Sequence, residues 1–346
     1  MRILVTGNMG YVGSVVVATM KEMLPGAAVA GYDSGFFAGC LVDPSMFPER
    51  LLEKQWFGDV RRFDGAILRG VDAVVHLAAV SNDPMGKAFE QVTWDVNCGA
   101  TLEIARRARE NGVGRFVFAS SCSLYGAGGT EARTEESPVA PLTAYARSKV
   151  GAEEGLRELA DGNFRVTCLR FATACGASPR LRLDLVLNDF VASAIATGVI
   201  KILSDGTPWR PLIHVEDMAR AIVWGMERGG VEGSFLTVNV GSARWNYQIL
   251  ELARAVQKEL AGVEIDLNSN AAPDRRSYRV DFSRFQSLAP DHQPRAELHM
   301  VVRELADSLR ATGFRDAEFR SSRWMRLKVL ESLVASGRIS SELYWR

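Results

Sequence analysis

The sequence has no net charge and little cysteine. Its 346 residues include 41 Lys+Arg and 41 Asp+Glu, a balance that excludes binding to nucleic acid or to an acidic membrane by charge alone. The five cysteines are scattered and form no C-x-x-C pair, so neither a disulfide framework nor a zinc site is expected. We therefore predict no metal, no nucleic-acid partner and a reducing, cytoplasmic location.

Long hydrophobic runs are also missing. No apolar segment approaches the ~18 residues that a membrane-spanning helix needs. Met1-Arg2 leads directly into a strand-like run, which leaves no room for a signal peptide. Hydrophobic residues make up 47% of the chain and charged residues 24%, an ordinary globular balance. We expect one large α/β unit or two coupled domains, with an ample core and no membrane partner.

The first 33 residues have the pattern of a dinucleotide site. An apolar run over residues 2–6 predicts a buried strand, and the loop Gly7-Asn8-Met9-Gly10-Tyr11-Val12-Gly13 leads into an apolar helix. The glycines suit a tight turn, close approach of a pyrophosphate and close helix–strand packing, and the helix N-terminus would face the phosphates. Asp33 ends the next predicted strand, where a carboxylate would bind the adenosine ribose. The absence of a nearby Arg or Lys favours NAD over NADP.

Strands alternate with helices through the first 170 residues. The strands are expected at 2–6, 27–32, 55–58, 72–77, 115–119 and 164–171, and the longest helices at 87–110 and 143–159. This alternation predicts an α/β fold with a Rossmann-type doubly wound parallel sheet and a smaller α/β substrate-binding lobe. We assign 1–172 to the NAD-binding domain, 173–320 to the smaller lobe, which could interleave with the first, and 321–346 to a C-terminal helical tail.

A Ser/Tyr/Lys set stands at the centre of the chain. Tyr145 and Lys149 lie four residues apart on a predicted helix, so they share one face. Ser121 and Ser123 follow the strand expected at 115–119, at the sheet edge where ligands bind in parallel α/β folds. A tyrosine with a pKa of about 10 can act as a base near pH 7 only if neighbouring positive charge stabilises the phenolate. Because the glycine loop and Asp33 accompany this set, we interpret it as a proton-transfer centre beside a nicotinamide.

His76 and the segment 35–54 do not add to this site. His76 lies inside an apolar strand, and we interpret it as structural rather than catalytic. The segment 35–54 is expected to form a long loop, and we assign it no function.

Further motifs extend the pattern to about residue 310. The sequence resembles the extended short-chain dehydrogenase/reductases, and within them the nucleotide-sugar epimerases and dehydratases of the UDP-glucose 4-epimerase type. The motifs that carry the resemblance are Thr6-Gly7-x-x-Gly10-x-x-Gly13, Asp59-Val60, His76-Leu77-Ala78-Ala79, Asn97-x-Gly99-x-Thr101, Ser120-Ser121-Cys122-Ser123-Leu124-Tyr125-Gly126, Tyr145-x-x-x-Lys149, Leu169-Arg170-Phe171, Trp209-Arg210-Pro211-Leu212-Ile213-His214-Val215-Glu216-Asp217 and Asp274-Arg275-Arg276.

The resemblance implies a role for each matched residue. Ser121, Ser123, Tyr145 and Lys149 would be catalytic, with Tyr145 as the base. The residues expected to bind NAD are Gly7, Met9, Gly10, Tyr11, Val12, Gly13, Asp33, Asp59, Val60, Leu77, Ala78, Ala79, Asn97, Tyr145 and Lys149. Those expected to bind a nucleotide-diphosphate sugar are Ser81, Ser121, Cys122, Ser123, Thr173, Asn188, Arg210 and Arg276. It also implies a homodimer formed through helices at about 89–110 and 143–160.

The end of the strand before Tyr125 separates the reactions. Dehydratases of this type carry two carboxylates where this chain has Cys122 and Ser123, and these residues cannot readily replace them as acid and base. We therefore predict an NAD-dependent epimerase acting at C4 through a 4-keto intermediate. Thr173 stands where hexose 4-epimerases usually have Asn, so the sugar stays open. The alternatives are a 4,6-dehydratase, a 4-ketoreductase and a catalytically silent nucleotide-binding regulator.

Overall fold

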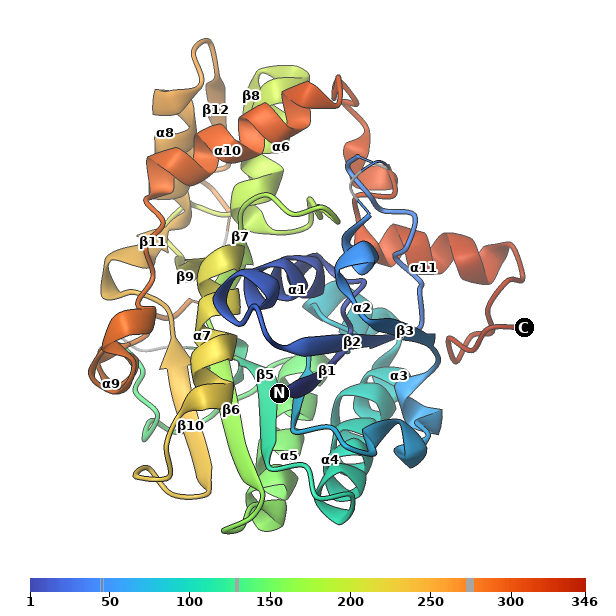
Figure 1. The fold of residues 1–346 in the computed structure, drawn as a ribbon. Helices are drawn as coiled ribbons and strands as arrows, with labels where there is room; N and C mark the ends of the chain where they lie inside the picture. Colours follow the sequence, from blue (N-terminus) through green and yellow to red (C-terminus); the bar gives the residue numbers. More distant parts are fainter. Residues whose placement is uncertain (44, 46, 128–130, 272–276) are drawn as a thin grey trace.

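The computed structural model describes residues 1–43, 45, 47–127, 131–271 and 277–346 (Figure 1). Seven parallel strands form its main sheet, in the order β10-β6-β5-β4-β1-β2-β3. The central four strands are apolar and almost entirely buried, as expected for a parallel sheet covered on both faces. The strands are β1 (Arg2–Thr6), β2 (Ala28–Asp33), β3 (Lys54–Phe57), β4 (Ala73–His76), β5 (Arg115–Ser121), β6 (Arg165–Phe171) and β10 (Phe235–Val240).

Helices cover both faces of this sheet (Figure 1). On one face α1 (Tyr11–Met23) packs against α7 (Val215–Glu227). On the other, α4 (Ala100–Glu110) packs against α5 (Ala144–Leu159). The predicted Rossmann-type doubly wound α/β fold is therefore confirmed. None of the helices in the described parts of the chain is both long and apolar enough to cross a membrane.

The smaller lobe combines two short sheets with three helices, at the top of Figure 1. One sheet has the order β11-β9-β7 and the other pairs β12 with β8. Their strands are β7 (Thr173–Cys175), β8 (Val199–Ile202), β9 (Trp209–His214), β11 (Asn246–Gln248) and β12 (Glu264–Leu267). The helices that pack on one another are α6 (Val186–Thr197), α8 (Ile249–Glu259) and α10 (Leu298–Ala311).

The chain crosses between the two parts more than once. Strand β10 and helix α7 come from the range 173–320, yet β10 pairs with β6 at the edge of the main sheet and α7 packs on α1. The short helix α9 (Ser283–Leu288) packs on β10. The two parts are thus interleaved in sequence, and residue 172 does not mark a clean break.

The long helix expected over 87–110 is divided. It consists of α2 (Asp83–Ala88), α3 (Glu90–Trp94), a π-helical turn (Asp95–Gly99) and α4. The π turn places Asn97 inward, where its side chain bonds both backbone groups of Val80. The prediction assumed one unbroken helical period, whereas a π turn adds one residue and offsets the face of every residue after it.

Helix α11 (Arg326–Ala335) lies against α2, beside the main sheet (Figure 1). Its Leu330 and Leu333 join Val80 and Met85 in a small apolar cluster that also contains Leu343. The helical part of the C-terminal tail thus packs on the body of the molecule. We refer to residues 323–346 as the capping segment.

Candidate active site

The glycine loop makes a close passage between β1 and α1. Gly7 has φ +75°, and a Cβ there would lie 2.6 Å from the Ala78 nitrogen. A Cβ on Gly13 would lie 2.3 Å from the Gly7 oxygen, so only glycine fits either position. Gly10 precedes α1 and supplies no side-chain cap. The first turn of α1 thus presents backbone N–H groups and the positive end of the helix dipole to the cavity.

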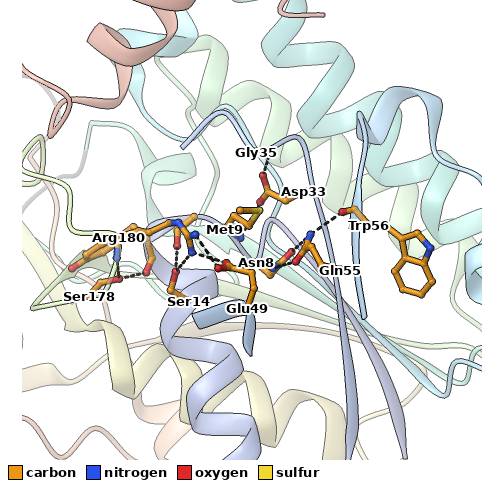
Figure 2. A network of polar contacts seen from close by, with 12 residues as sticks. Asn8, Met9, Ser14, Asp33, Gly35, Glu49, Gln55, Trp56, Ser178 and Arg180 are labelled. Carbon is orange, nitrogen blue, oxygen red and sulfur yellow. Dashed lines mark hydrogen bonds and ion pairs between the residues drawn. The ribbon is translucent and has the colours of Figure 1, made fainter. Parts of the chain in front are cut away.

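Asp33 is held rigidly at the end of β2. Its carboxylate accepts hydrogen bonds from the Met9 nitrogen at 3.0 Å and the Gly35 nitrogen at 2.7 Å (Figure 2). Burial raises its pKa, and these two bonds oppose the rise. Since Met9 is itself buried and outside the cavity, it contributes to the site by orienting Asp33. The geometry presents a carboxylate where a ribose diol could be bound.

A second polar group lies behind the loop (Figure 2). Arg180 donates to both carboxylate oxygens of Glu49, at 2.6 and 3.0 Å, and to the Ser14 hydroxyl at 3.2 Å. Ser178 donates to the Tyr11 carbonyl at 2.7 Å. This network fastens the start of α1 to the segment that enters the smaller lobe. Glu49 belongs to the range 35–54, for which sequence analysis found no role.

Tyr145 sits in the first turn of α5, and Thr143 caps that helix by accepting from the Ala146 nitrogen at 3.2 Å. Burial raises the pKa of Tyr145 to about 12, while a hydrogen bond with the Ser121 side chain and the charge of Arg182 oppose the rise. Ser121 in turn accepts from the Ser123 nitrogen at 3.1 Å. Strand β5 and helix α5 therefore bring the expected serine and tyrosine together.

Lys149 lies one turn further along α5 and is buried. Its ammonium donates to the Ala119 carbonyl at 2.7 Å and lies 5.7 Å from the centre of the Tyr145 ring. Burial lowers its pKa to about 7, opposed by Glu153 and Cys168. A lysine near its pKa and beside a phenol is suited to stabilise a phenolate.

Two cavities meet at this point. The first, of about 340 Å³, contains the glycine loop, Asp33, Tyr145 and Lys149. The second, of about 820 Å³, lies towards the smaller lobe and contains Arg210. Their shared lining residues are Asn82, Asp83, Ser123, Thr173, Leu185 and Tyr278. A ligand in one cavity can thus contact a ligand in the other beside Tyr145.

Most of the residues expected to bind the cofactor line the first cavity. They are Gly7, Gly10, Tyr11, Val12, Gly13, Asp33, Asp59, Val60, Leu77, Ala78, Ala79, Tyr145 and Lys149. Asn97 is placed elsewhere: it is buried, holds Val80 by its backbone and donates to the Ser148 hydroxyl at 3.1 Å. Its role in this structure is to support the wall that follows β4.

The residues expected to bind the sugar nucleotide divide in the same way. Ser81 and Ser121 line the first cavity, Arg210 the second, and Ser123 and Thr173 both. Two others are buried outside these cavities. The Cys122 thiol donates to the Arg170 carbonyl at 3.0 Å, and Asn188 accepts from the Gly176 nitrogen at 3.1 Å. Arg276 lies outside the described residues.

Cys122 points inward because the strand ends at Ser121 and a 3-10 turn over Cys122–Tyr125 follows. Burial raises the pKa of the Cys122 thiol well above its usual value, so the thiol is not an acid or base near neutral pH. The expectation that Cys122 contacts substrate is therefore not supported by its position.

His76 is part of the core, as predicted. Its ring nitrogens lie 2.8 Å from the Thr6 hydroxyl and 2.9 Å from the Thr101 hydroxyl. Burial lowers its pKa to about 3, which keeps the ring neutral.

Sequence reasoning missed several residues of the first cavity, among them Arg61, Arg182, Tyr278 and Arg326. Arg61 donates to the Asp59 carboxylate, and Arg182 pairs with Asp184 and donates to the Ser81 hydroxyl at 3.0 Å. Tyr278 and Arg326 also line the cavity. Arg61 directly follows the Asp59-Val60 motif, and that position was a signal for it; the other three neither follow a predicted strand end nor belong to a quoted motif.

Comparison with known proteins agrees with this arrangement. A model of the NAD dependent epimerase/dehydratase family matches residues 3–241, the part of the chain that holds the glycine loop, Tyr145 and Lys149. The chain belongs to this family. It is accordingly an NAD-dependent enzyme of the epimerase/dehydratase class, and the predicted resemblance is confirmed.

Relatives within the family catalyse different reactions. UDP-glucose 4-epimerase from Bacillus subtilis (strain 168) is 26% identical over 300 residues, covering 77% of this chain and 84% of that protein. dTDP-glucose 4,6-dehydratase from Streptomyces niveus is 29% identical over 294 residues, covering 82% and 84%. The structure of MoeE5 in complex with UDP-glucose and NAD is 25% identical, with a TM-score of 0.74 over 90% of this chain and 99% of that one.

The family cofactor fits the first cavity. The close glycine passage and the first turn of α1 suit a pyrophosphate, and Asp33 suits a ribose. Lys149 and Tyr145 line the same cavity. NAD, predicted from the sequence, is the cofactor.

Proposed function

We propose that the protein is a nucleotide-sugar epimerase that inverts C4 through a transient 4-keto sugar. The observation that carries the proposal is the meeting of the two cavities beside Tyr145, with Ser123 and Thr173 in the shared wall. When bound, NAD supplies a hydride acceptor and a positively charged ring, and the hydride is later returned to the sugar, so net redox is zero. The chain must then position one hydroxyl and move its proton.

Tyr145 is the group we assign to that proton. Its hydrogen bond with Ser121 opposes the burial that raises the pKa of Tyr145 to about 12. The Lys149 ammonium, 5.7 Å from the ring centre, and the positive ring of bound NAD would favour the phenolate further. The phenolate would accept the proton of the sugar C4 hydroxyl and give it back after the sugar has turned over in the cavity. Ser121 would hydrogen-bond the oxygen that becomes the 4-keto group.

Ser123 supports the presence of a sugar in the shared wall. Its hydroxyl is buried and has no hydrogen-bond partner among the described residues. A buried hydroxyl without a partner is costly, and a substrate hydroxyl would satisfy it. Thr173, which faces the same wall, presents a smaller side chain than the Asn usual in hexose 4-epimerases.

Arg210 is assigned to the diphosphate of the sugar nucleotide. It lies on β9, whose pairing with β7 and β11 fixes the wall of the second cavity. A guanidinium can bind a phosphate through two parallel hydrogen bonds, which fixes the orientation of the sugar relative to Tyr145.

A 4,6-dehydratase is the second candidate, because Asp83 lines both cavities. One carboxylate is therefore present where an acid for elimination could act. The elimination also needs a base, and the buried, neutral Cys122 thiol does not supply one. We rank the epimerase first for this reason.

The product decides between these reactions. Purified protein with NAD is incubated with UDP-glucose, UDP-N-acetylglucosamine, UDP-glucuronic acid and dTDP-glucose, and the products are followed by NMR and mass spectrometry. The expected outcome is a C4-inverted nucleotide-sugar of unchanged mass. Loss of 18 Da would establish a dehydratase, and stoichiometric consumption of reduced cofactor with a 4-keto substrate would establish a ketoreductase.

We further propose that the enzyme is a homodimer that pairs helices α4 and α5 with their counterparts. Trp94, the last residue of α3, is 46% exposed and supplies an apolar side chain next to α5. Such an exposed aromatic group beside two packed helices suits a helix–helix interface.

A further inference from the structure

The capping segment contributes part of the wall of the first cavity. Arg326, Leu330 and Leu343 line this cavity together with the glycine loop, Asp33 and Lys149. These three residues lie beyond residues 3–241, the region that matches the family model. The wall therefore contains a part that the family motifs do not account for.

Several contacts fix the capping segment in this position. Arg61 donates to the carbonyls of Glu342 and Leu343, at 2.7 and 3.2 Å, and its guanidinium lies 3.7 Å from the centre of the Tyr344 ring. The Trp345 indole donates to the Ser34 carbonyl at 2.7 Å, next to Asp33. The segment is thus tied to the two loops that border the expected adenosine end of the cavity.

Arg326 is the cation that this segment brings to the cavity. It is 2% exposed, and one terminal nitrogen, Nη2, donates to the carbonyls of Arg180 and Leu181, at 2.6 and 3.1 Å. The other terminal nitrogen, Nη1, is buried without a hydrogen-bond partner among the described residues. A buried N–H donor without an acceptor costs free energy, because it has lost its hydrogen bonds to water and gained none in the protein.

The surroundings of Arg326 are short of negative charge. In the described part of the chain no carboxylate pairs with it, and Asp184, which is close enough to influence it, is held by Arg182 at 2.6 and 2.9 Å. Burial lowers the pKa of Arg326 to about 10, and the nearby charges of Arg182 and Arg180 act in the same direction. An anionic ligand would correct this imbalance.

We propose that Arg326 binds the pyrophosphate of NAD opposite the first turn of α1, which makes the capping segment a further cofactor-binding element. Arg326 lies over the carbonyls of residues 180 and 181, in the segment that Ser178 ties to the Tyr11 carbonyl at the start of α1. A guanidinium and a helix N-terminus that line one cavity are a suitable pair for two adjacent phosphates.

The diphosphate of the sugar nucleotide is the other ligand with this chemistry. Arg326 lines the cavity of the glycine loop, whereas the second cavity, as the described residues outline it, contains Arg210 and not Arg326. The position therefore favours NAD. The assignment rests on the family cofactor alone and holds whether the enzyme epimerises or dehydrates.

Calorimetric binding to cofactor-stripped, full-length protein tests this assignment. The probes are NAD, adenosine, which lacks the pyrophosphate, and UDP, which carries the substrate-type diphosphate. For Arg326→Gln we expect NAD affinity to fall about 10- to 100-fold, the effect of one or two charge-assisted hydrogen bonds, with adenosine and UDP unchanged. Arg326→Lys keeps the positive charge but not the paired N–H groups of the guanidinium, so its NAD affinity should fall less than that of Arg326→Gln. Arg315→Gln, an exposed arginine outside the capping segment and outside the lining of both cavities, should bind all three probes normally.

Three results would overturn the assignment. Unchanged NAD affinity in Arg326→Gln would show that Arg326 does not contact the cofactor. Equal weakening of NAD and adenosine would show that Arg326 only holds the capping segment in place. Selective weakening of UDP would move Arg326 to the substrate diphosphate. Since each readout is a binding constant, failure of the proposed epimerase reaction would leave this test intact.

Discussion

Two regions that border the first cavity differ in whether their buried charged groups are paired within the chain. Behind the glycine loop, the charge of Arg180 is balanced by Glu49 through two hydrogen bonds (Figure 2). In the cavity wall, Arg326 has no paired carboxylate among the described residues, and the Ser123 hydroxyl has no partner there either. Arg180 also keeps one buried N–H, on Nε, without a partner, so the contrast lies in charge balance rather than in perfect bonding.

This contrast separates scaffold from ligand site. A buried charge that the chain itself neutralises keeps the loop and helix in place, and its removal is felt in stability. A buried cation that lines a cavity and has no carboxylate partner in the described part of the chain is suited to bind an anion from outside. Substitutions in the two regions should therefore have different effects, with activity or ligand binding lost on one side and folding stability on the other.

Tyr145→Phe should give the largest effect on the ligand side. Removing the phenol removes the proposed base, and general acid–base catalysis contributes about 10²- to 10⁴-fold. We expect turnover to fall by that factor in the product assay, with the thermal midpoint and NAD content close to wild type. Tyr247→Phe, a partly buried tyrosine outside both cavities, is the matched control and should retain its rate. Full activity in Tyr145→Phe would remove the assigned base.

Glu49→Gln should give the corresponding effect on the scaffold side. The substitution leaves Arg180 buried with an unbalanced charge, which costs about 3–5 kcal/mol in the free energy of unfolding. Urea titration measures this loss, and turnover of the folded protein should stay within about twofold of wild type. The exposed Glu53→Gln serves as control. A variant as stable as wild type but poor in turnover would reverse the division between the two regions.

Lys149 gives a smaller effect that depends on pH. Its folded pKa of about 7 lies below the usual 10.5, so between these values the unfolded chain binds more protons. The contribution of Lys149 to the free energy of unfolding therefore rises with pH between about 7 and 10.5. Below about pH 7 it no longer changes with pH, because Lys149 is protonated in both the folded and the unfolded chain.

Comparison of cofactor-stripped wild type with Lys149→Met isolates this group. We expect the difference in unfolding free energy, wild type minus variant, to rise by about 2 kcal/mol from pH 7 to pH 9. Denaturant titrations at several pH values measure it. A flat difference across that range would mean that Lys149 keeps its ordinary pKa when buried.

The sequence predicted the parts of the site that follow strand ends. Gly7, Asp33 and Ser121 meet in one cavity because the carboxyl ends of parallel strands share one edge of the sheet. The same reasoning failed for side chains whose direction depends on a local break. Asn97 points inward because it lies in a π turn, and Cys122 because it lies in a 3-10 turn. The spacing of residues in the sequence predicts neither turn.

Long-range contacts set the other limit. Strand β10 pairs with β6 at the edge of the main sheet, although residues of the smaller lobe separate the two strands in the sequence. A strand-like run of residues does not show which strand it will pair with. Arg326 and Glu49 come from segments without any motif, and only the folded chain shows that one faces the cavity and the other faces Arg180. Motifs thus predict the reactive residues of the site better than the residues that form the rest of the cavity wall.

The contacts of the capping segment also bear on the order of folding. The hydrogen bond between Trp345 and Ser34 joins residues 311 positions apart, and that between Arg61 and Glu342 spans 281. Closing loops of this length is entropically costly, so such contacts form late unless earlier structure brings their ends together. We therefore expect the main sheet to assemble before the capping segment docks. With Arg326 on the pyrophosphate, as proposed above, the cofactor site is complete only once that segment is in place.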